Sequence, residues 1–254
     1  MGKFFERYEK GYYQEVYEEL LQLQDHIVNP EIQEDALLVA HEIMRRVRYN
    51  LEVLIIPKLK KMGYRFGAGS WDHADDLSIK ELALVQKEEP IFRKPTARNS
   101  IYISKLEQLV GSLPLSIKCW YLDVGDVSLI GAFHSPIPGA NYKSGYGLDP
   151  LHTQPLKDVF EELRDFADED DTDSIMLPIS PDGDLKYGYS GGGDYEIAVP
   201  CKNFDAELCG EEHHLTFINY LRLCFQWGGF PGLEKEMKIT QEELDFLTRD
   251  LLDF

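Results

Sequence analysis

Apolar residues near the N-terminus recur every three or four positions, which is the period of one face of an α-helix. Residues 13–27 carry this pattern first, and residues 37–54 carry it again. Between the two stretches, Asn29 can cap a helix, and Pro30 fits the first helical position, where its missing N–H costs nothing. The sequence therefore predicts two helices joined by a short turn and packed antiparallel within residues 1–66.

The pattern changes after this hairpin. Residues 67–99 are rich in Gly, Pro and charge and show only a short helical stretch, so we interpret them as a connector. Residues 100–254 alternate helical and β-type stretches, with a strand at 127–133, a helix at 155–166, and three strands, IMLPIS, DLKYGYS and YEIAVP, within 175–200. This order predicts an α+β fold, in which an N-terminal antiparallel helical hairpin precedes a domain with a mainly antiparallel sheet flanked by helices.

Charge is distributed unevenly along the chain. The 254 residues carry 26 Lys and Arg against 45 Asp and Glu, a net charge of −19. Residues 1–66 hold 10 basic and 11 acidic residues, a net charge of −1, which leaves −18 for residues 67–254. Such a region repels phosphate groups, so we expect no nucleic acid and no anionic membrane among its partners. It attracts a basic protein, although the charge could also serve solubility alone.

The acidic segment at 158–173 is the expected contact with such a partner. We expect the partner-binding carboxylates to be Asp158, Glu161, Glu162, Asp165, Asp168, Glu169, Asp170, Asp171 and Asp173. A block of like charge is also typical of a solvated loop, which remains the alternative interpretation.

No recognisable catalytic motif is present. Gly-x-Ser-x-Gly, His-Glu-x-x-His and Walker lysine loops are all missing from the sequence, so we expect a noncatalytic protein without a cofactor. The cysteines do not form Cys-x-x-Cys pairs, and the irregular spacing of Cys201, Cys209, His213, His214 and Cys224 favours buried thiols over a zinc site. We therefore expect no metal.

The alternative function is a small-ligand-binding protein or an enzyme that uses the loop at 134–152. Gly, Pro, Tyr and His are concentrated there, and binding sites favour such loops on rigid scaffolds. The expected ligand contacts are His134, Tyr142, Tyr146, Asp149 and His152.

Location and assembly follow only in part from the sequence. The chain has no run of about 18 apolar residues and no secretory signal at its start, which predicts a cytoplasmic protein. The oligomeric state stays open.

Three motifs in the second half occur in a familiar order. They are LPLSIKCWYLDVGDVSLIG, LPISPDGDLKYGYSGGGDYEIAVP and HHLTFINYLRLCF. In this order the chain, over about residues 100–228, resembles the SUKH superfamily, which includes yeast cell-wall-assembly regulators and many bacterial immunity proteins. Val124-Gly125-Asp126 stands where that family usually has Asn-Gly-Gly. The resemblance implies an α+β domain, and an immunity-type protein that binds a toxin.

Overall fold

The computed structural model describes residues 3–67, 79–88, 90–133, 148–166, 175–235 and 239–254. The described α-helices are α1 (Lys3–Glu9), α2 (Tyr13–Gln22), α3 (Pro30–Tyr49), α4 (Ile56–Lys61), α5 (Ile79–Glu88), α6 (Ala97–Val110), α7 (Leu115–Cys119), α8 (Leu156–Phe166), α9 (Gly183–Lys186), α10 (Phe217–Gln226) and α11 (Gln241–Thr248). The shorter helical segments are the 3₁₀ turns η1 (Gln24–Val28) and η4 (Pro231–Glu234) and the π-helical turns η2 (Asn50–Ile55) and η3 (Trp120–Val124). The strands are β1 (Arg65–Phe66), β2 (Phe92–Arg93), β3 (Asp126–Val127), β4 (Gly131–Ala132), β5 (Ile175–Pro181) and β6 (Asp194–Val199).

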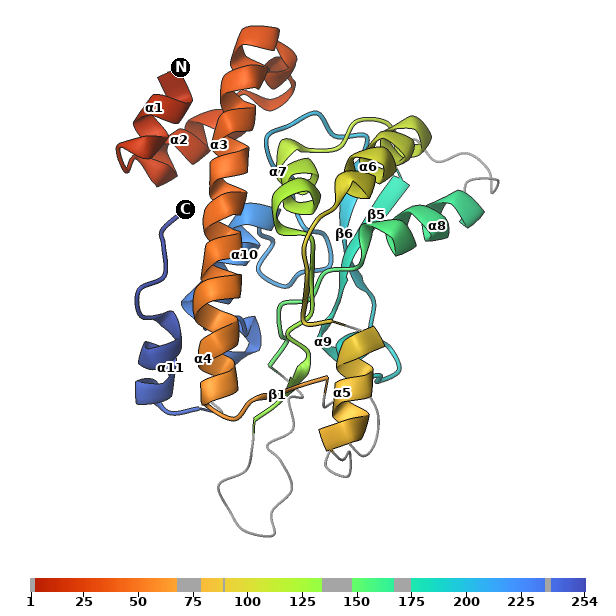
Figure 1. Cartoon of the computed structure of the whole chain (residues 1–254). Coiled ribbons are helices and arrows are strands. Elements are labelled where there is room, and N and C mark those ends of the chain that lie inside the picture. The colour runs from red at the N-terminus through yellow and green to blue at the C-terminus, as the bar shows by residue number, and fades with distance from the viewer. Residues whose placement is uncertain (1–2, 68–78, 89, 134–147, 167–174, 236–238) are drawn as a thin grey trace.

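The two helices predicted within residues 1–66 are present as α2 and α3, which are joined through η1. The Asn29 side chain accepts a hydrogen bond of 3.2 Å from the backbone N–H of Glu31 and so caps α3. Helices α3 and α4, joined by η2, form the long rod at one side of the molecule (Figure 1). The additional helix α1 begins where the Asp35 carboxylate accepts from the backbone N–H groups of Phe4, at 2.7 Å, and Phe5, at 3.1 Å. That contact with α3 explains why a segment this short is helical.

The hairpin is packed against the rest of the chain. Buried apolar side chains from residues 8–66 and 103–254 belong to one hydrophobic core. At this boundary the Tyr17 hydroxyl lies 2.9 Å from Asp205 Oδ2 and 2.5 Å from Thr216 Oγ1. Burying these polar groups is tolerable because each finds a partner there. The boundaries 1–66, 67–99 and 100–254 remain a prediction about domains, while the packing joins the first and last of them.

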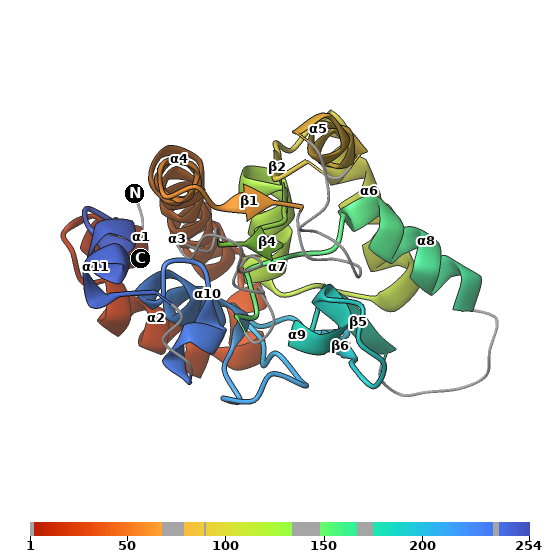
Figure 2. The same cartoon turned by 90° about the horizontal axis from the view of Figure 1, so that it is seen from below.

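The strands pair antiparallel in the order β1–β4, β2–β3 and β5–β6. Backbone hydrogen bonds extend these pairs through residues 151–154: Thr153 N–H donates to Val127, and Gln154 N–H donates to Ile179, both at 2.9 Å. This segment, which we call the central segment, therefore lies between β3 and β5. The α+β class with antiparallel pairing is confirmed. Figure 2 shows α6 and α8 at the end of the molecule opposite α11.

Two of the predicted strands, DLKYGYS and residues 127–133, do not form as single strands. DLKYGYS contains the helical turn α9, because Asp182 accepts from the backbone N–H groups of Leu185 and Gly193, each at 2.8 Å, and β5 pairs directly with β6. The stretch 127–133 is not one strand, since β3 pairs with β2 whereas β4 pairs with β1. A Cβ at Gly131 would lie only 2.3 Å from the carbonyl oxygen of the strand opposite, so β4 approaches β1 closely because this residue is glycine.

Candidate functional site

A pocket of ≈ 460 Å³ lies where the central segment passes beside β3, α9 and the start of α8. The volume is within the range of about 300–1,000 Å³ that is usual for ligand sites. Its polar lining consists of Arg93, Asp126, Ser128, His152, Thr153, Gln154, Asp158, Lys186 and Asp194. These residues come from five separate segments, which the backbone pairing of the central segment brings together.

His152, a residue expected from the sequence, contributes to this lining. Its backbone forms a bridge with Ser128, which fixes the residue beside β3. Burial, together with a smaller effect of the Lys186 charge, lowers the pKa of His152 to about 3, so the imidazole is neutral at pH 7. Its buried Nδ1 has no hydrogen-bond partner among the described residues.

Asp149, the other described residue of the predicted ligand loop, forms an ion pair beside the pocket. Its Oδ1 lies 2.5 Å from Nζ of Lys186, whose side chain is 0% exposed. The Tyr195 hydroxyl donates to Asp149 Oδ2 at 3.1 Å. Burial and the nearby Asp149 carboxylate raise the pKa of Tyr195, so it stays a hydrogen-bond donor. Among the described side chains, Lys186 is paired with Asp149 rather than with Asp126, Asp158 or Asp194.

Three carboxylates, those of Asp126, Asp158 and Asp194, face the pocket. Burial raises the pKa of Asp126, Arg93 at 3.3 Å opposes this shift, and the charge of Asp158 adds to it. Burial also raises the pKa of Asp194, although a hydrogen bond of 3.0 Å from the Gln154 amide opposes the shift. The pocket is therefore rich in hydrogen-bond acceptors and negative charge.

The acidic character continues from the pocket onto α8 and β6. Burial and the charge of Asp194 raise the pKa of Glu162 on α8. Burial raises the pKa of Glu196 on β6, and the charges of Asp194 and Glu162 raise it further. Among the described side chains, no Lys or Arg forms a salt bridge with Glu162, Asp194 or Glu196. Helix α8 and β6 thus share a surface of mutually repelling carboxylates, which we call the acidic face.

The structure describes only some of the predicted partner-binding residues. Of the predicted partner-binding residues, Asp158, Glu161, Glu162 and Asp165 lie on α8. Only Asp158 lines the pocket, whereas Glu161 pairs with Lys157 and Asp165 with Arg164. The remaining partner-binding residues lie outside the described residues: Asp168, Glu169, Asp170, Asp171 and Asp173.

The predicted ligand loop is described only near its end. His134, Tyr142 and Tyr146 lie outside the described residues. The pocket residues Asp126, Lys186 and Asp194 were missed, because each adjoins a turn or a short strand, where polar residues are common and carry no specific signal.

Comparison with known proteins adds no relative: no family model, curated protein or solved structure matches this chain. Within the part of the chain that the structure describes, no helix has the length and apolar character needed to cross a membrane. The resemblance to the SUKH superfamily stays a prediction.

Proposed function

We propose that this chain is a noncatalytic binding module for a basic protein, and that its pocket receives a lysine or arginine side chain of the partner. The observation that supports this function is a set of three carboxylates around one cavity, of which Asp126 and Asp194 are partly buried and Asp158 is exposed. A guanidinium group presents several N–H donors in a plane and binds carboxylates through two parallel hydrogen bonds. The carboxylate oxygens of Asp126, Asp158 and Asp194 are the acceptors that the pocket offers to those N–H groups.

The electrostatics favour the same class of partner. The raised pKa values of Asp126, Asp194, Glu162 and Glu196 mean that burial and repulsion disfavour their charged forms. A cation placed among them relieves that repulsion. The long-range attraction of the acidic face would mainly accelerate association, so binding should slow and weaken as ionic strength rises. An immunity-type role in the cytoplasm, with a basic toxin as the partner, fits this proposal and the sequence resemblance.

A small cationic ligand is the second candidate for the same pocket. His152 favours it, because this residue lines the pocket and its buried Nδ1, which has no partner among the described residues, would be satisfied by a ligand that reached it. An enzyme receives less support. The amine of Lys186, the lysine of the pocket, is already paired with Asp149 and is therefore not free to attack a substrate.

Binding of an arginine tripeptide, blocked at both ends, tests the proposal by titration calorimetry at low and raised salt. The site variant is D126N/D158N/D194N, and the control variant E9Q/E15Q/E242Q removes the same charge from exposed positions on α1, α2 and α11. We expect the site variant to bind at least about tenfold more weakly, since a hydrogen bond to a charged group contributes about 1.5–3 kcal/mol. The control variant should keep most of the affinity.

The outcomes separate the candidates. Equal weakening in both variants would mean that only bulk charge attracts the peptide, and the pocket assignment would be wrong. If blocked single arginine binds as tightly as the tripeptide, the small-ligand function gains over the protein-binding one. Circular dichroism of each variant checks that the fold is retained.

A further inference from the structure

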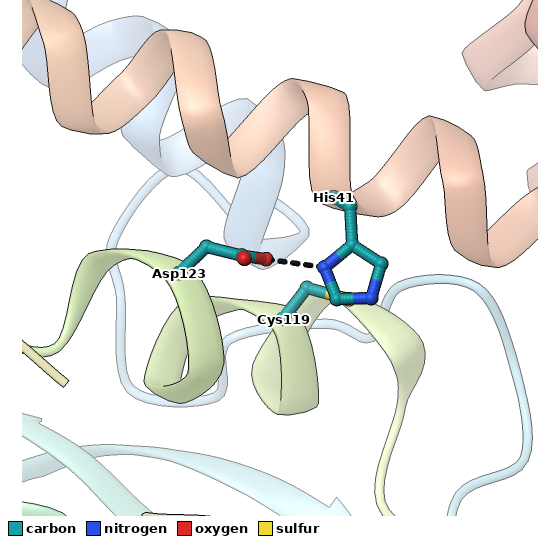
Figure 3. Close-up of side chains that lie close together, drawn as sticks. All are labelled: His41, Cys119 and Asp123. Atoms are coloured by element: carbon teal, nitrogen blue, oxygen red, sulfur yellow. Dashed lines mark hydrogen bonds and ion pairs between the residues drawn. The ribbon is translucent and has the colours of Figure 1, made fainter. Parts of the chain in front are cut away.

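A second group of side chains lies between α3 of the hairpin and the segment formed by α7 and η3. His41, Cys119 and Asp123 place one ligand-type atom each within 4.8 Å of one another (Figure 3). His41 Nδ1 lies 2.5 Å from Asp123 Oδ2. Within the described residues, this is the one group of His, Cys and acidic side chains close enough to share a metal ion. We call it the His-Cys-Asp cluster.

The backbone explains how the cluster is formed. Cys119 ends α7 and Asp123 lies in η3, four residues later, so both side chains emerge on the face that points to α3. His41 projects from the middle of α3 onto that face (Figure 3). The turn η3 is π-helical, with the Gly125 N–H bonded to the Trp120 carbonyl five residues back. Single π-turns are less stable than α-helix and occur frequently at functional sites.

We propose that the His-Cys-Asp cluster binds a zinc ion, with water in the fourth position. Thiolate, imidazole and carboxylate are all zinc ligands. A thiolate and a carboxylate together carry two negative charges, which balance the charge of Zn²⁺. The side chains of His41 and Asp123 are 38% and 28% exposed, so water can reach the ion from outside. Cys119 is 0% exposed and would bind it from the inner side.

The geometry requires only a small adjustment. Bonds of about 2.0–2.3 Å to a tetrahedral zinc ion place its ligand atoms about 3.3–3.6 Å apart. The contact of 2.5 Å between His41 and Asp123 must therefore open by about 1 Å, while the two separations that involve the Cys119 sulfur already lie within 4.8 Å. Partly exposed side chains can make this change by rotation. An apolar wall would resist it, but these two ligands face solvent.

Neighbouring cations do not oppose the ion strongly, because each is already paired. Lys118 lies 3.0 Å from Glu107, Arg45 lies 2.6 Å from Glu42, and Arg48 lies 3.3 Å from Glu52. A role for Cys119 as a catalytic nucleophile is less favourable, since its side chain is 0% exposed and a substrate has no direct access to the sulfur. The zinc proposal needs no substrate to reach the sulfur.

Titration of the purified full chain with Co²⁺, after treatment with a chelator, tests the proposal. Cobalt bound by a thiolate gives a sulfur-to-metal charge-transfer absorption, and tetrahedral cobalt gives intense visible bands. We expect both to saturate at one equivalent per chain and to disappear when Zn²⁺ is added. The melting temperature of the protein should also rise with Zn²⁺, because an ion that binds only the folded state stabilises it.

Three site variants and one control locate the ion. C119S should abolish the charge-transfer band, and H41Q and D123N should each weaken cobalt binding by at least about tenfold, the usual cost of losing one ligand or its support. H41Q changes a partly exposed side chain, so it remains informative if C119S fails to fold. C209S alters a partly exposed cysteine outside the cluster and should change nothing. Absence of the charge-transfer band in the unmodified chain, or its loss in C209S but not in H41Q, would overturn the proposal.

Discussion

The ion pair between Asp149 and Lys186 offers the sharpest test of the structure. Replacing Asp149 by Asn leaves the Lys186 ammonium, 0% exposed, without a counter-charge. Removal of one partner from a buried ion pair costs about 3–5 kcal/mol, because the other charge stays desolvated. The reverse change, K186M, should cost less, since the Asp149 side chain is 18% exposed and keeps the hydrogen bond from Tyr195. We therefore expect D149N to be the more destabilising of the two.

Urea unfolding followed by circular dichroism at pH 7 measures these differences. In the double variant D149N/K186M neither charge of this pair remains, so its loss should be smaller than the sum of the single losses by about 2–3 kcal/mol. The control is E6Q, which removes the pairing of Glu6 with Lys10, whose side chains are 57% and 61% exposed. Exposed pairs of this kind contribute almost nothing measurable. If D149N lowers the free energy of unfolding no more than E6Q does, the burial argument is wrong.

Three further changes test other parts of the molecule. Y17F removes the hydroxyl that bonds to the buried Asp205 and should lower the free energy of unfolding by about 1–3 kcal/mol; an unchanged urea midpoint would contradict this contact. His152 has a folded pKa of about 3, below its unfolded value, so its stability contribution is complete above about pH 6.5 and is lost as the pH falls towards 3. Between pH 7 and pH 4 the unmodified chain should therefore lose about 3 kcal/mol more than H152Q, as judged from urea unfolding at each pH. G125A places a Cβ 2.2 Å from a backbone oxygen of β2 at a φ of +97°, whereas Gly191, at +99°, has nothing within 4 Å; thermal melts should show a larger loss for G125A than for G191A.

The helices with strong periodicity were predictable, and the short irregular elements were not. The hairpin follows from apolar spacing and from the cap at Asn29, both of which are local features. The stretch after Asp182 resembled a strand because it alternates, but the carboxylate of that residue satisfies two backbone N–H groups and so stabilises the helical turn α9. The helix α1 depends on Asp35, thirty or more residues away, which no local pattern reveals.

The candidate sites depend on contacts between distant residues. Asp149 and Lys186 are 37 positions apart, and His41 and Asp123 are 82 positions apart. A spacing rule finds metal ligands only when two of them share one turn, as Cys119 and Asp123 do. The acidic segment and the loop at 134–152 were predicted separately, and one residue from each, Asp158 and His152, now lines a single pocket. Sequence composition named these two residues separately, and only the backbone pairing of the central segment brings them to one pocket.

The net charge of −18 in residues 67–254 is spread unevenly over the folded chain. Several cations of this region are engaged in internal contacts: Lys186 with Asp149, Lys118 with Glu107, and Lys94 with Glu52 of the hairpin. Arg222 stacks on Tyr17 and donates to a backbone carbonyl at the C-terminus. The acids of α8 and β6 are therefore left with few opposing charges, at the end of the molecule far from α11 (Figure 2). A basic partner attracted by the whole chain would accordingly meet the acidic face and the pocket first, and the hairpin would lie away from the contact.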